Sequence, residues 1–212
     1  MNVGVLASGS GANLQALIDS AAQGRLGPAR LIAVCANVLE CGALSKARAA
    51  GLTSLVIDPR HFYAGAAFDR ELAARLIALR VELVVLDGFT RILSEELLAA
   101  FPRRVIRTHS ALAPAFPGLE SQREVLRCGM KVSGCTVQFV AASVMAGIVI
   151  AQSAVPVLDH DDEESLRLRV LAEENQLLPA VVRAIAERRV IVEDRRALVI
   201  GAVPSGYALR SL

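Results

Sequence analysis

The first hundred residues of the chain alternate short apolar runs with amphipathic stretches. The runs predict four strands, and the stretches between them repeat apolar residues at helical spacing, as Leu14, Leu17 and Ile18 do. The continuous apolar run over residues 83–86 is typical of a strand buried on both faces of a sheet. The repeated β-α-β order predicts a parallel sheet with right-handed crossovers. We expect strands over 3–7, 31–36, 54–57 and 83–86, and helices from residue 13 and over 43–50 and 68–80.

The pattern changes in the second half of the chain. Two long extended runs follow each other there with no helix between them, which predicts antiparallel pairing at the end of the sheet. An acidic segment then precedes a long amphipathic stretch, and Asp161 or Asp162 is expected near the start of that helix. The expected elements are a strand from Val105, extended runs over 132–140 and 149–157, a helix over 162–187 and a hairpin around 193–196.

Composition and charge are those of a single α/β domain. Of the 212 residues, 54% are hydrophobic, which is enough for a sizeable core, and 21% are charged. The net charge is only +2 and the basic residues are scattered, which argues against a nucleic-acid or anionic-membrane partner. No apolar run reaches the roughly 18 residues that span a bilayer, and the N-terminus lacks the basic segment of a secretion signal. We expect one cytoplasmic domain over residues 1–212, with halves at 1–104 and 105–212.

Two features could in principle hold a metal. The four cysteines have no C-x-x-C spacing, so free thiols in a reduced compartment are expected, with a zinc site as the weaker alternative. The acidic run 159–164 could also ligate a metal, but negative charge at the start of a helix complements the helix dipole. We therefore expect no metal. His61 and His160 lie in polar sequence and are expected on the surface.

A glycine-rich turn over residues 8–13 links the first strand to the first helix. Glycine lets the backbone approach a ligand closely, and a helix N-terminus presents free N–H groups to an anion. Gly11, Ala12 and Asn13 are therefore candidates for a phosphate site. The alternative is an ordinary strand-to-helix turn, because the segment lacks the third glycine of a dinucleotide fingerprint and the lysine of a P-loop.

Two further segments follow predicted strands. Residues 86–93 leave the fourth strand, and ligands of open α/β sheets bind just beyond such ends. His109 opens a loop rich in small residues and proline, where an imidazole could donate a proton or stabilise an oxyanion. A tight connection with a solvated Arg91, and a histidine with purely structural hydrogen bonds, are the respective alternatives.

Taken together, the segments resemble the folate-dependent formyltransferases of the glycinamide ribonucleotide transformylase type. The resemblance implies a Rossmann-like fold: a mostly parallel twisted sheet with helices on both faces and an antiparallel C-terminal part. It implies a phosphate-binding half over 1–104 and a folate-binding half over 105–212. The stretches that carry it, in order, are residues 9–15, 37–51, 68–72, 88–94, 114–119, 133–137, 155–157 and 162–166.

The resemblance also implies the chemistry. A formyl group would pass from 10-formyltetrahydrofolate, a co-substrate, to the amine of glycinamide ribonucleotide in purine synthesis. The partners would be these small molecules, with no metal, and the protein a monomer or homodimer. By position, the phosphate and ribose would be held by Gly11, Ala12, Asn13 and Glu174, and the folate by Arg91, Ile92, Leu93 and Val144.

The family's catalysis rests on an Asn, a His and an Asp, and this chain keeps one of the three. His109 is present, but Arg107 stands at the Asn position and Met145 at the Asp position. Asp87 stands where the family commonly has a small residue, and is a candidate replacement carboxylate. Further departures in the pocket are Ala12, Gly65, Ser110, Gln138, Ala142 and Asn175.

These replacements leave several hypotheses for function. Loss of one oxyanion donor costs on the order of 10²–10³ in rate, and loss of a proton-transfer partner about 10²–10⁴. The chain would then be a formyltransferase with impaired catalysis. The alternatives are an inactive relative that binds folate or nucleotide, or serves as a partner subunit, and a stable fold without a working pocket.

Overall fold

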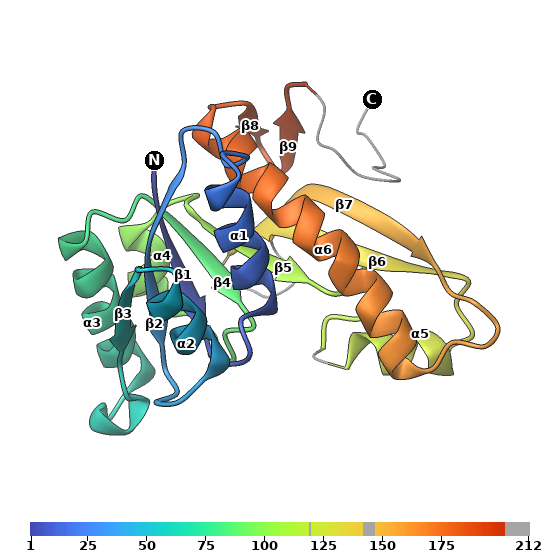
Figure 1. The fold of residues 1–212 in the computed structure, drawn as a ribbon, viewed down its shortest axis with the longest axis horizontal. Coiled ribbons are helices and arrows are strands. Elements are labelled where there is room, and N and C mark those ends of the chain that lie inside the picture. The colour runs from blue at the N-terminus through green and yellow to red at the C-terminus, as the bar shows by residue number, and fades with distance from the viewer. Residues whose placement is uncertain (119, 142–146, 202–212) are drawn as a thin grey trace.

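The computed structural model describes residues 1–118, 120–141 and 147–201. The first part of the chain forms four parallel strands joined by helices (Figure 1). These elements are β1 (Asn2–Ala7), α1 (Ala12–Ala22), β2 (Arg30–Ala36), α2 (Gly42–Ala49), β3 (Thr53–Val56), the short 3₁₀ helix η1 (Pro59–His61), α3 (Gly65–Ala78) and β4 (Leu83–Asp87). The predicted β-α-β order is confirmed.

The second part extends the same sheet and covers it. β5 continues the parallel set beside β4, and β6 and β7 add antiparallel strands at the edge, as the two extended runs predict. The full order is β3-β2-β1-β4-β5-β6-β7, and the hairpin β8–β9 forms a separate small sheet. These elements are α4 (Glu95–Ala100), β5 (Val105–His109), α5 (Ser121–Arg127), β6 (Val132–Phe139), β7 (Ile148–Pro156), α6 (Glu163–Ala186), β8 (Val190–Glu193) and β9 (Arg196–Val199).

Helices cover both faces of the sheet, with a separate apolar cluster on each (Figure 1). On one face α1, α2 and α6 pack over the strands, and the buried side chains include Leu14, Leu44 and Leu178. On the other face α3 and α4 pack through Phe68, Leu72 and further apolar residues. A strand with both faces covered needs apolar residues throughout, which explains the unbroken run in β4.

The long helix α6 begins as predicted. Asp162 is its N-cap and accepts a hydrogen bond from the Ser165 N–H at 2.7 Å, while the Ser165 hydroxyl accepts one from the Asp162 N–H at 3.0 Å. This capping box satisfies two backbone donors that a helix start would otherwise leave free. The acidic run therefore starts a helix, as expected.

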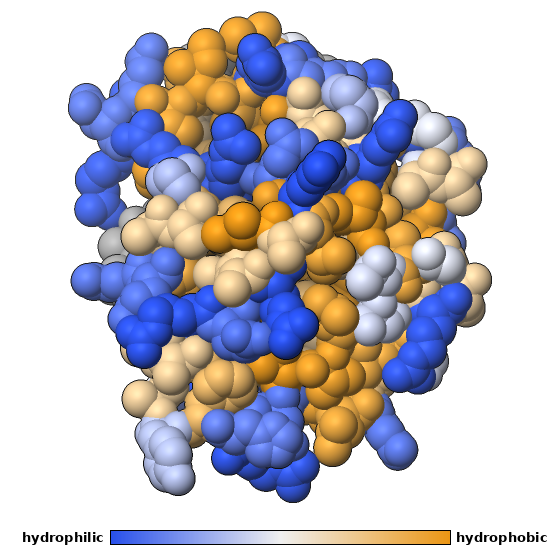
Figure 2. Space-filling view, turned by 90° about the vertical axis from the view of Figure 1, so that its left-hand side faces the viewer, coloured by the Kyte–Doolittle hydropathy of each residue, from blue (hydrophilic) through white to orange (hydrophobic). Residues whose placement is uncertain are grey.

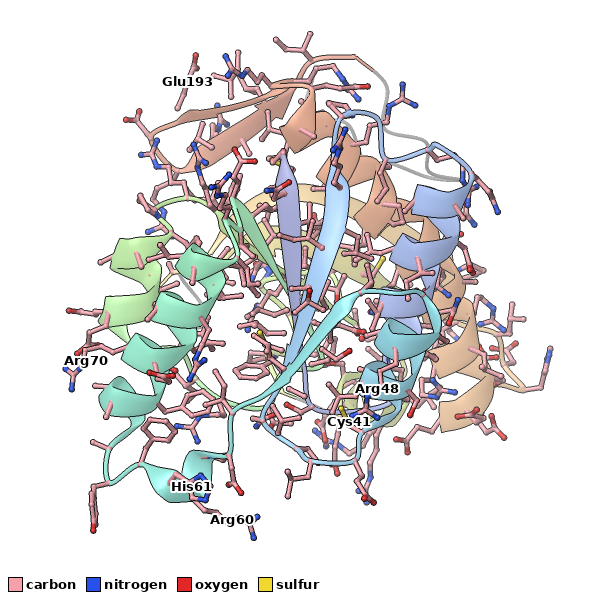
Figure 3. The ribbon with its side chains drawn as sticks, turned by 60° about the vertical axis from the view of Figure 1, so that its left-hand side comes forward. Cys41, Arg48, Arg60, His61, Arg70 and Glu193 are labelled. Atoms are coloured by element: carbon pink, nitrogen blue, oxygen red, sulfur yellow. The ribbon has the colours of Figure 1, made fainter. Side chains whose placement is uncertain are left out.

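The surface shows which apolar residues the fold leaves out. Figure 2 views the side of the molecule that carries α3 and β3, where apolar and polar side chains lie side by side. Ile77 of α3 is 56% exposed there, whereas its neighbour Leu76 is fully buried. Figure 3 shows Arg60 and His61 at η1, far from Glu193 on the closing hairpin. His61 and His160 are both exposed, as predicted.

Leu76 and Ile77 offer a matched test of the second apolar cluster. Replacement Leu76→Ala removes buried methyl groups and leaves a cavity, so we expect a loss of about 2–5 kcal/mol in unfolding free energy. Ile77→Ala removes an exposed side chain and should stay within about 0.5 kcal/mol of the parent. Urea unfolding followed by circular dichroism measures both, and equal losses would contradict the assigned orientation of α3.

Candidate active site

A hollow of about 390 Å³ opens at the carboxyl ends of β4 and β5. Its lining includes residues 88–93, which follow β4, together with the end of β5. Ligands of open α/β sheets bind at this edge, and the volume lies in the range of about 300–1,000 Å³ typical of small-molecule sites. Five predicted site residues line it: Arg91, Ile92, Leu93, Arg107 and His109. Val144 and Met145, also predicted for the site, lie outside the described residues, as does Ala142.

Three adjacent residues that line this hollow, Arg91, Ile92 and Leu93, differ in their exposure and contacts. Arg91 stacks its guanidinium over the ring of Phe68, with 4.4 Å between the guanidinium carbon and the ring centroid. Ile92 is 79% exposed, so an apolar surface is available to a ligand, and Leu93 is buried in the second apolar cluster. The segment therefore offers an apolar face and backbone groups rather than a free cation.

His109 and Arg107 lie two residues apart at the end of β5. Burial lowers the pKa of the His109 imidazole below its ordinary value, and the Arg107 cation lowers it further. The hydrogen bonds of the ring to the backbone of Ala115 and Phe116 oppose this shift. His109 is therefore mostly neutral at pH 7, and burial is the larger cause.

Arg107 is held in place by its neighbour across the strands. Arg107 on β5 pairs with Gln138 on β6. With the Gln138 amide oxygen facing the guanidinium, it accepts from Nε at 2.8 Å and from Nη2 at 2.9 Å. The two residues thus form one bidentate unit. Replacing Arg107 by Asn would leave Gln138 without this partner.

The start of α1 is built around Gly11. Its φ is +70°, in the left-handed region that favours glycine. A β-carbon there would lie 2.8 Å from the Ala43 α-carbon, so α1 and α2 approach too closely for any other residue. Lys46 of α2 donates from Nζ to the carbonyl oxygen of Gly11 at 2.9 Å.

The helix N-terminus already holds an anion that belongs to the protein. Asp87, the last residue of β4, accepts a hydrogen bond at Oδ2 from the Leu14 N–H at 2.9 Å. Burial raises the pKa of the Asp87 carboxyl, while hydrogen bonds from Leu14 and Asn13 and the Lys46 cation oppose the rise. Asp87 does not line the hollow beside His109; its carboxylate instead accepts a hydrogen bond in the first turn of α1.

A second buried carboxylate lies beside it. Glu174 of α6 accepts from Asn13 Nδ2 at 2.9 Å and from the Ser110 hydroxyl at 2.6 Å. Burial is the largest influence on Glu174 and raises its carboxyl pKa, and the nearby Asp87 raises it further. The structure thus brings the predicted residues Asn13 and Glu174 together, with Ser110 as a third member of the network.

Polar side chains at the strand ends form hydrogen bonds with one another that the sequence did not indicate. The Ser8 hydroxyl donates to Asn37 Oδ1 at 2.6 Å and accepts from the Thr90 N–H at 3.0 Å, which links the ends of β1, β2 and β4. The signal in the sequence is positional: Ser8 and Asn37 each directly follow a buried strand. Arg195, at the turn of the β8–β9 hairpin, lines an adjoining hollow of about 200 Å³ that also contains His109. No local sequence pattern indicates that Arg195 lies near His109.

Two negative findings apply to the described residues alone. Over residues 1–118, 120–141 and 147–201, no three or more His, Cys, Asp or Glu side chains are grouped so as to hold a metal ion. Within the same ranges, no helix has the length and apolarity needed to cross a bilayer. The four cysteines are free thiols, and burial raises the pKa of Cys35 to about 12.

The buried carboxylate of Asp87 yields a stability prediction. Because burial raises its pKa, the folded state holds the proton more tightly than the unfolded chain, and the stability it contributes is lost as pH rises above about 4. Asp87→Asn keeps an acceptor for the Leu14 N–H without the charge. The variant should melt about 2–4 °C higher than the parent at pH 8, and this difference should shrink as the pH falls towards about 4, the ordinary pKa of an aspartate. A constant or opposite difference, measured by calorimetry across that range, would contradict the cost assigned to the buried charge.

A family model described as "Formyl transferase" matches residues 1–182. The phosphoribosylglycinamide formyltransferase of Escherichia coli is 35% identical over 211 residues, covering 98% of this chain and 99% of that protein. The trifunctional purine biosynthetic protein adenosine-3 of Drosophila melanogaster is 42% identical over 87% of the chain, which spans 14% of that protein's length.

A solved structure agrees with the predicted fold. The glycinamide ribonucleotide transformylase 1 of Symbiobacterium toebii superposes with a TM-score of 0.92 at 46% identity, and the match covers 95% of this chain and 94% of the other. The mostly parallel, Rossmann-like sheet with its antiparallel C-terminal part is thereby confirmed. The chain belongs to the formyl transferase family and resembles, within it, the phosphoribosylglycinamide formyltransferases.

Proposed function

We propose that the hollow at the ends of β4 and β5 binds the 10-formyltetrahydrofolate co-substrate. The single observation that carries the proposal is the position of His109 in the same hollow as the segment 88–93. Backbone groups of this segment and the exposed side chain of Ile92 suit a flat heterocycle that needs hydrogen bonds at its edge and apolar contact on its face. Val144 is proposed to complete the folate contacts.

The proposed reaction is formyl transfer to the amine of glycinamide ribonucleotide, as the names of the similar proteins suggest. The amine nitrogen attacks the formyl carbon, an oxyanion forms, and the bond from that carbon to N10 of the folate then breaks. The amine loses a proton and N10 gains one, so the step balances without a metal or an oxidant. His109 is the proposed catalytic residue, and it would donate a hydrogen bond to the oxyanion.

The proposed rate is low, because the groups around His109 no longer favour its charged form. A neutral imidazole carries one N–H, and Nε2 already lies 3.4 Å from the carbonyl oxygen of Ala115. Arg107 offers a positive charge, but its guanidinium is bound by Gln138. With Met145 at the position of the family's Asp, a carboxylate that would raise the histidine pKa is missing there.

The acceptor is proposed to lie along the start of α1, where Gly11, Ala12, Asn13 and Glu174 would face its phosphate and ribose. Gly11 and Asn13 are held there by the close packing of α1 on α2 and by Glu174. We propose a cytoplasmic protein, monomeric or homodimeric, that acts on small molecules. The alternative is a relative without transfer activity that binds folate or nucleotide, or serves as a partner subunit; the Arg107–Gln138 pair in the pocket favours it.

Folate binding is tested by the apolar face of the hollow. Ile92→Asp should weaken binding of 5-formyltetrahydrofolate by tenfold or more, because a charged side chain replaces the apolar contact. A tenfold loss of affinity corresponds to about 1.4 kcal/mol of binding free energy. Ile77→Asp, an equivalent change on the outer face of α3, should leave the affinity unchanged. Calorimetry at concentrations well above micromolar provides the readout. No binding by the parent chain would remove the folate from the proposal.

Catalysis is tested by restoring the family's residues. The parent chain should transfer formyl at least about 10³-fold more slowly than a family member that has all three catalytic residues. Arg107→Asn combined with Met145→Asp should recover part of this rate, and more than the two single changes do together, because catalytic residues act as a unit. Arg104→Asn, just before β5, serves as the control.

The measurement is the single-turnover rate with 10-formyltetrahydrofolate and glycinamide ribonucleotide. A parent rate within tenfold of an ordinary family member would show that the site is not impaired. Arg107 would then have to act on the oxyanion itself.

A further inference from the structure

A second hollow, of about 430 Å³, lies at the edge of the sheet opposite the candidate active site. Met1, which precedes β1, and Leu83, which begins β4, line it together with the end of α6 and with β8. Figure 1 shows the N-terminus, the end of α6 and β8 at the same end of the molecule. We propose that this hollow is a binding site for a phosphate monoester with an apolar body, separate from the site of formyl transfer.

The floor of the hollow is apolar. Leu83 and Phe139 are buried, whereas Ile185, Val190 and Val192 are only partly buried and leave apolar surface uncovered. Small-molecule sites have volumes of about 300–1,000 Å³ and are mostly apolar, with a few polar groups that fix the ligand. This floor therefore suits the apolar body of a ligand.

Two exposed arginines, Arg103 and Arg188, contribute the charge that would hold the ligand. Across the described residues 1–118, 120–141 and 147–201, neither guanidinium forms an ion pair or a hydrogen bond. Other arginines near the end of α6 differ in this respect, because Arg183 and Arg189 each donate to the Glu187 carboxylate at 2.7 Å. The donors of Arg103 and Arg188 therefore remain available to an anion.

The charge balance of the lining favours a phosphate. Glu82 is the carboxylate among the lining residues that the structure describes, and it already accepts a hydrogen bond from the Asn2 N–H at 2.7 Å. Guanidinium groups bind phosphate oxygens in bidentate pairs. A phosphate monoester carries close to two negative charges at neutral pH and has three terminal oxygens, so it can bond to both arginines at once.

The backbone at the two arginines is a separate observation. Arg103 has a φ of +54° and Arg188 a φ of +57°, in the left-handed region that residues other than glycine seldom adopt. At the turn where Arg188 follows α6, the shorter helices α2 and α5 are followed by Gly51 and Gly129. The fold thus places two guanidinium groups at positions where the backbone itself favours a residue without a side chain.

The test uses three probes that separate the charged head from the apolar body: 1-naphthyl phosphate, inorganic phosphate and 1-naphthol. Binding is measured by calorimetry at constant ionic strength. The parent should bind 1-naphthyl phosphate at submillimolar concentration, about tenfold or more tightly than either of the other probes. Arg103→Gly combined with Arg188→Gly should weaken this binding by about tenfold or more, because charge-assisted hydrogen bonds are lost.

Arg80→Gly is the matched control. Arg80 is also exposed and has a φ of +57°, but it does not line the hollow. Glycine suits the left-handed backbone at all three positions, so the variants should fold. Arg80→Gly should bind 1-naphthyl phosphate as the parent does. If the double variant does not fold, Arg188→Gly alone decides, with a weaker affinity than the parent expected.

Three results would overturn the proposal. They are no submillimolar binding of 1-naphthyl phosphate by the parent, equal binding by the parent and the folded arginine variants, and an equal loss in Arg80→Gly. Equal binding would place the probe elsewhere, and an equal loss in the control would reflect net charge alone. Binding of 5-formyltetrahydrofolate should be the same in the parent and the double variant, because its proposed site lies at the opposite edge of the sheet.

Discussion

The parallel pairing of β1 with β2 and β4, and of β4 with β5, is the constraint on which the rest of the molecule depends. Parallel strands end at one edge, so the residue that follows each strand becomes a neighbour of the others (Figure 1). Ser8, Asn37, Asp87 and His109 lie far apart in the sequence, yet all stand at or just beyond strand ends. The scaffold therefore decides where the chemistry lies, and the side chains at this edge decide what it is.

The charged side chains at this edge of the sheet bear on activity, whereas family membership follows from the scaffold. A cation lies beside His109, where a carboxylate would favour the imidazolium, and a carboxylate lies at the start of α1, where an anionic substrate group would be expected. Each of these charges has a local partner: Gln138 for Arg107, and the Leu14 N–H for Asp87. Both charges are thus accommodated within the fold.

Hydrophobic periodicity was sufficient to predict the sheet, its crossovers, the antiparallel end and the start of α6, because these depend on spacing over many residues. The short helices α4 and α5 were missed, since six or seven residues give too few turns for a periodic signal. For the site, the sequence was sufficient to name residues that line the hollow, but not to predict which charged side chains bind which partners there. The Arg107–Gln138 pair depends on register across two strands, and the cap formed by Asp87 joins residues 73 positions apart. Contacts of this kind follow from tertiary packing, which a single sequence does not specify.

The pocket disfavours the charged form of His109, through burial first and through Arg107 second. The most direct test is a proton NMR titration of the imidazole in the unliganded protein, with its signal assigned by a His109→Gln variant. We predict an apparent pKa below the ordinary histidine value of about 6.5, which rises when Arg107 is replaced by Asn. A pKa at or above that value in the parent, unchanged by Arg107→Asn, would contradict the account.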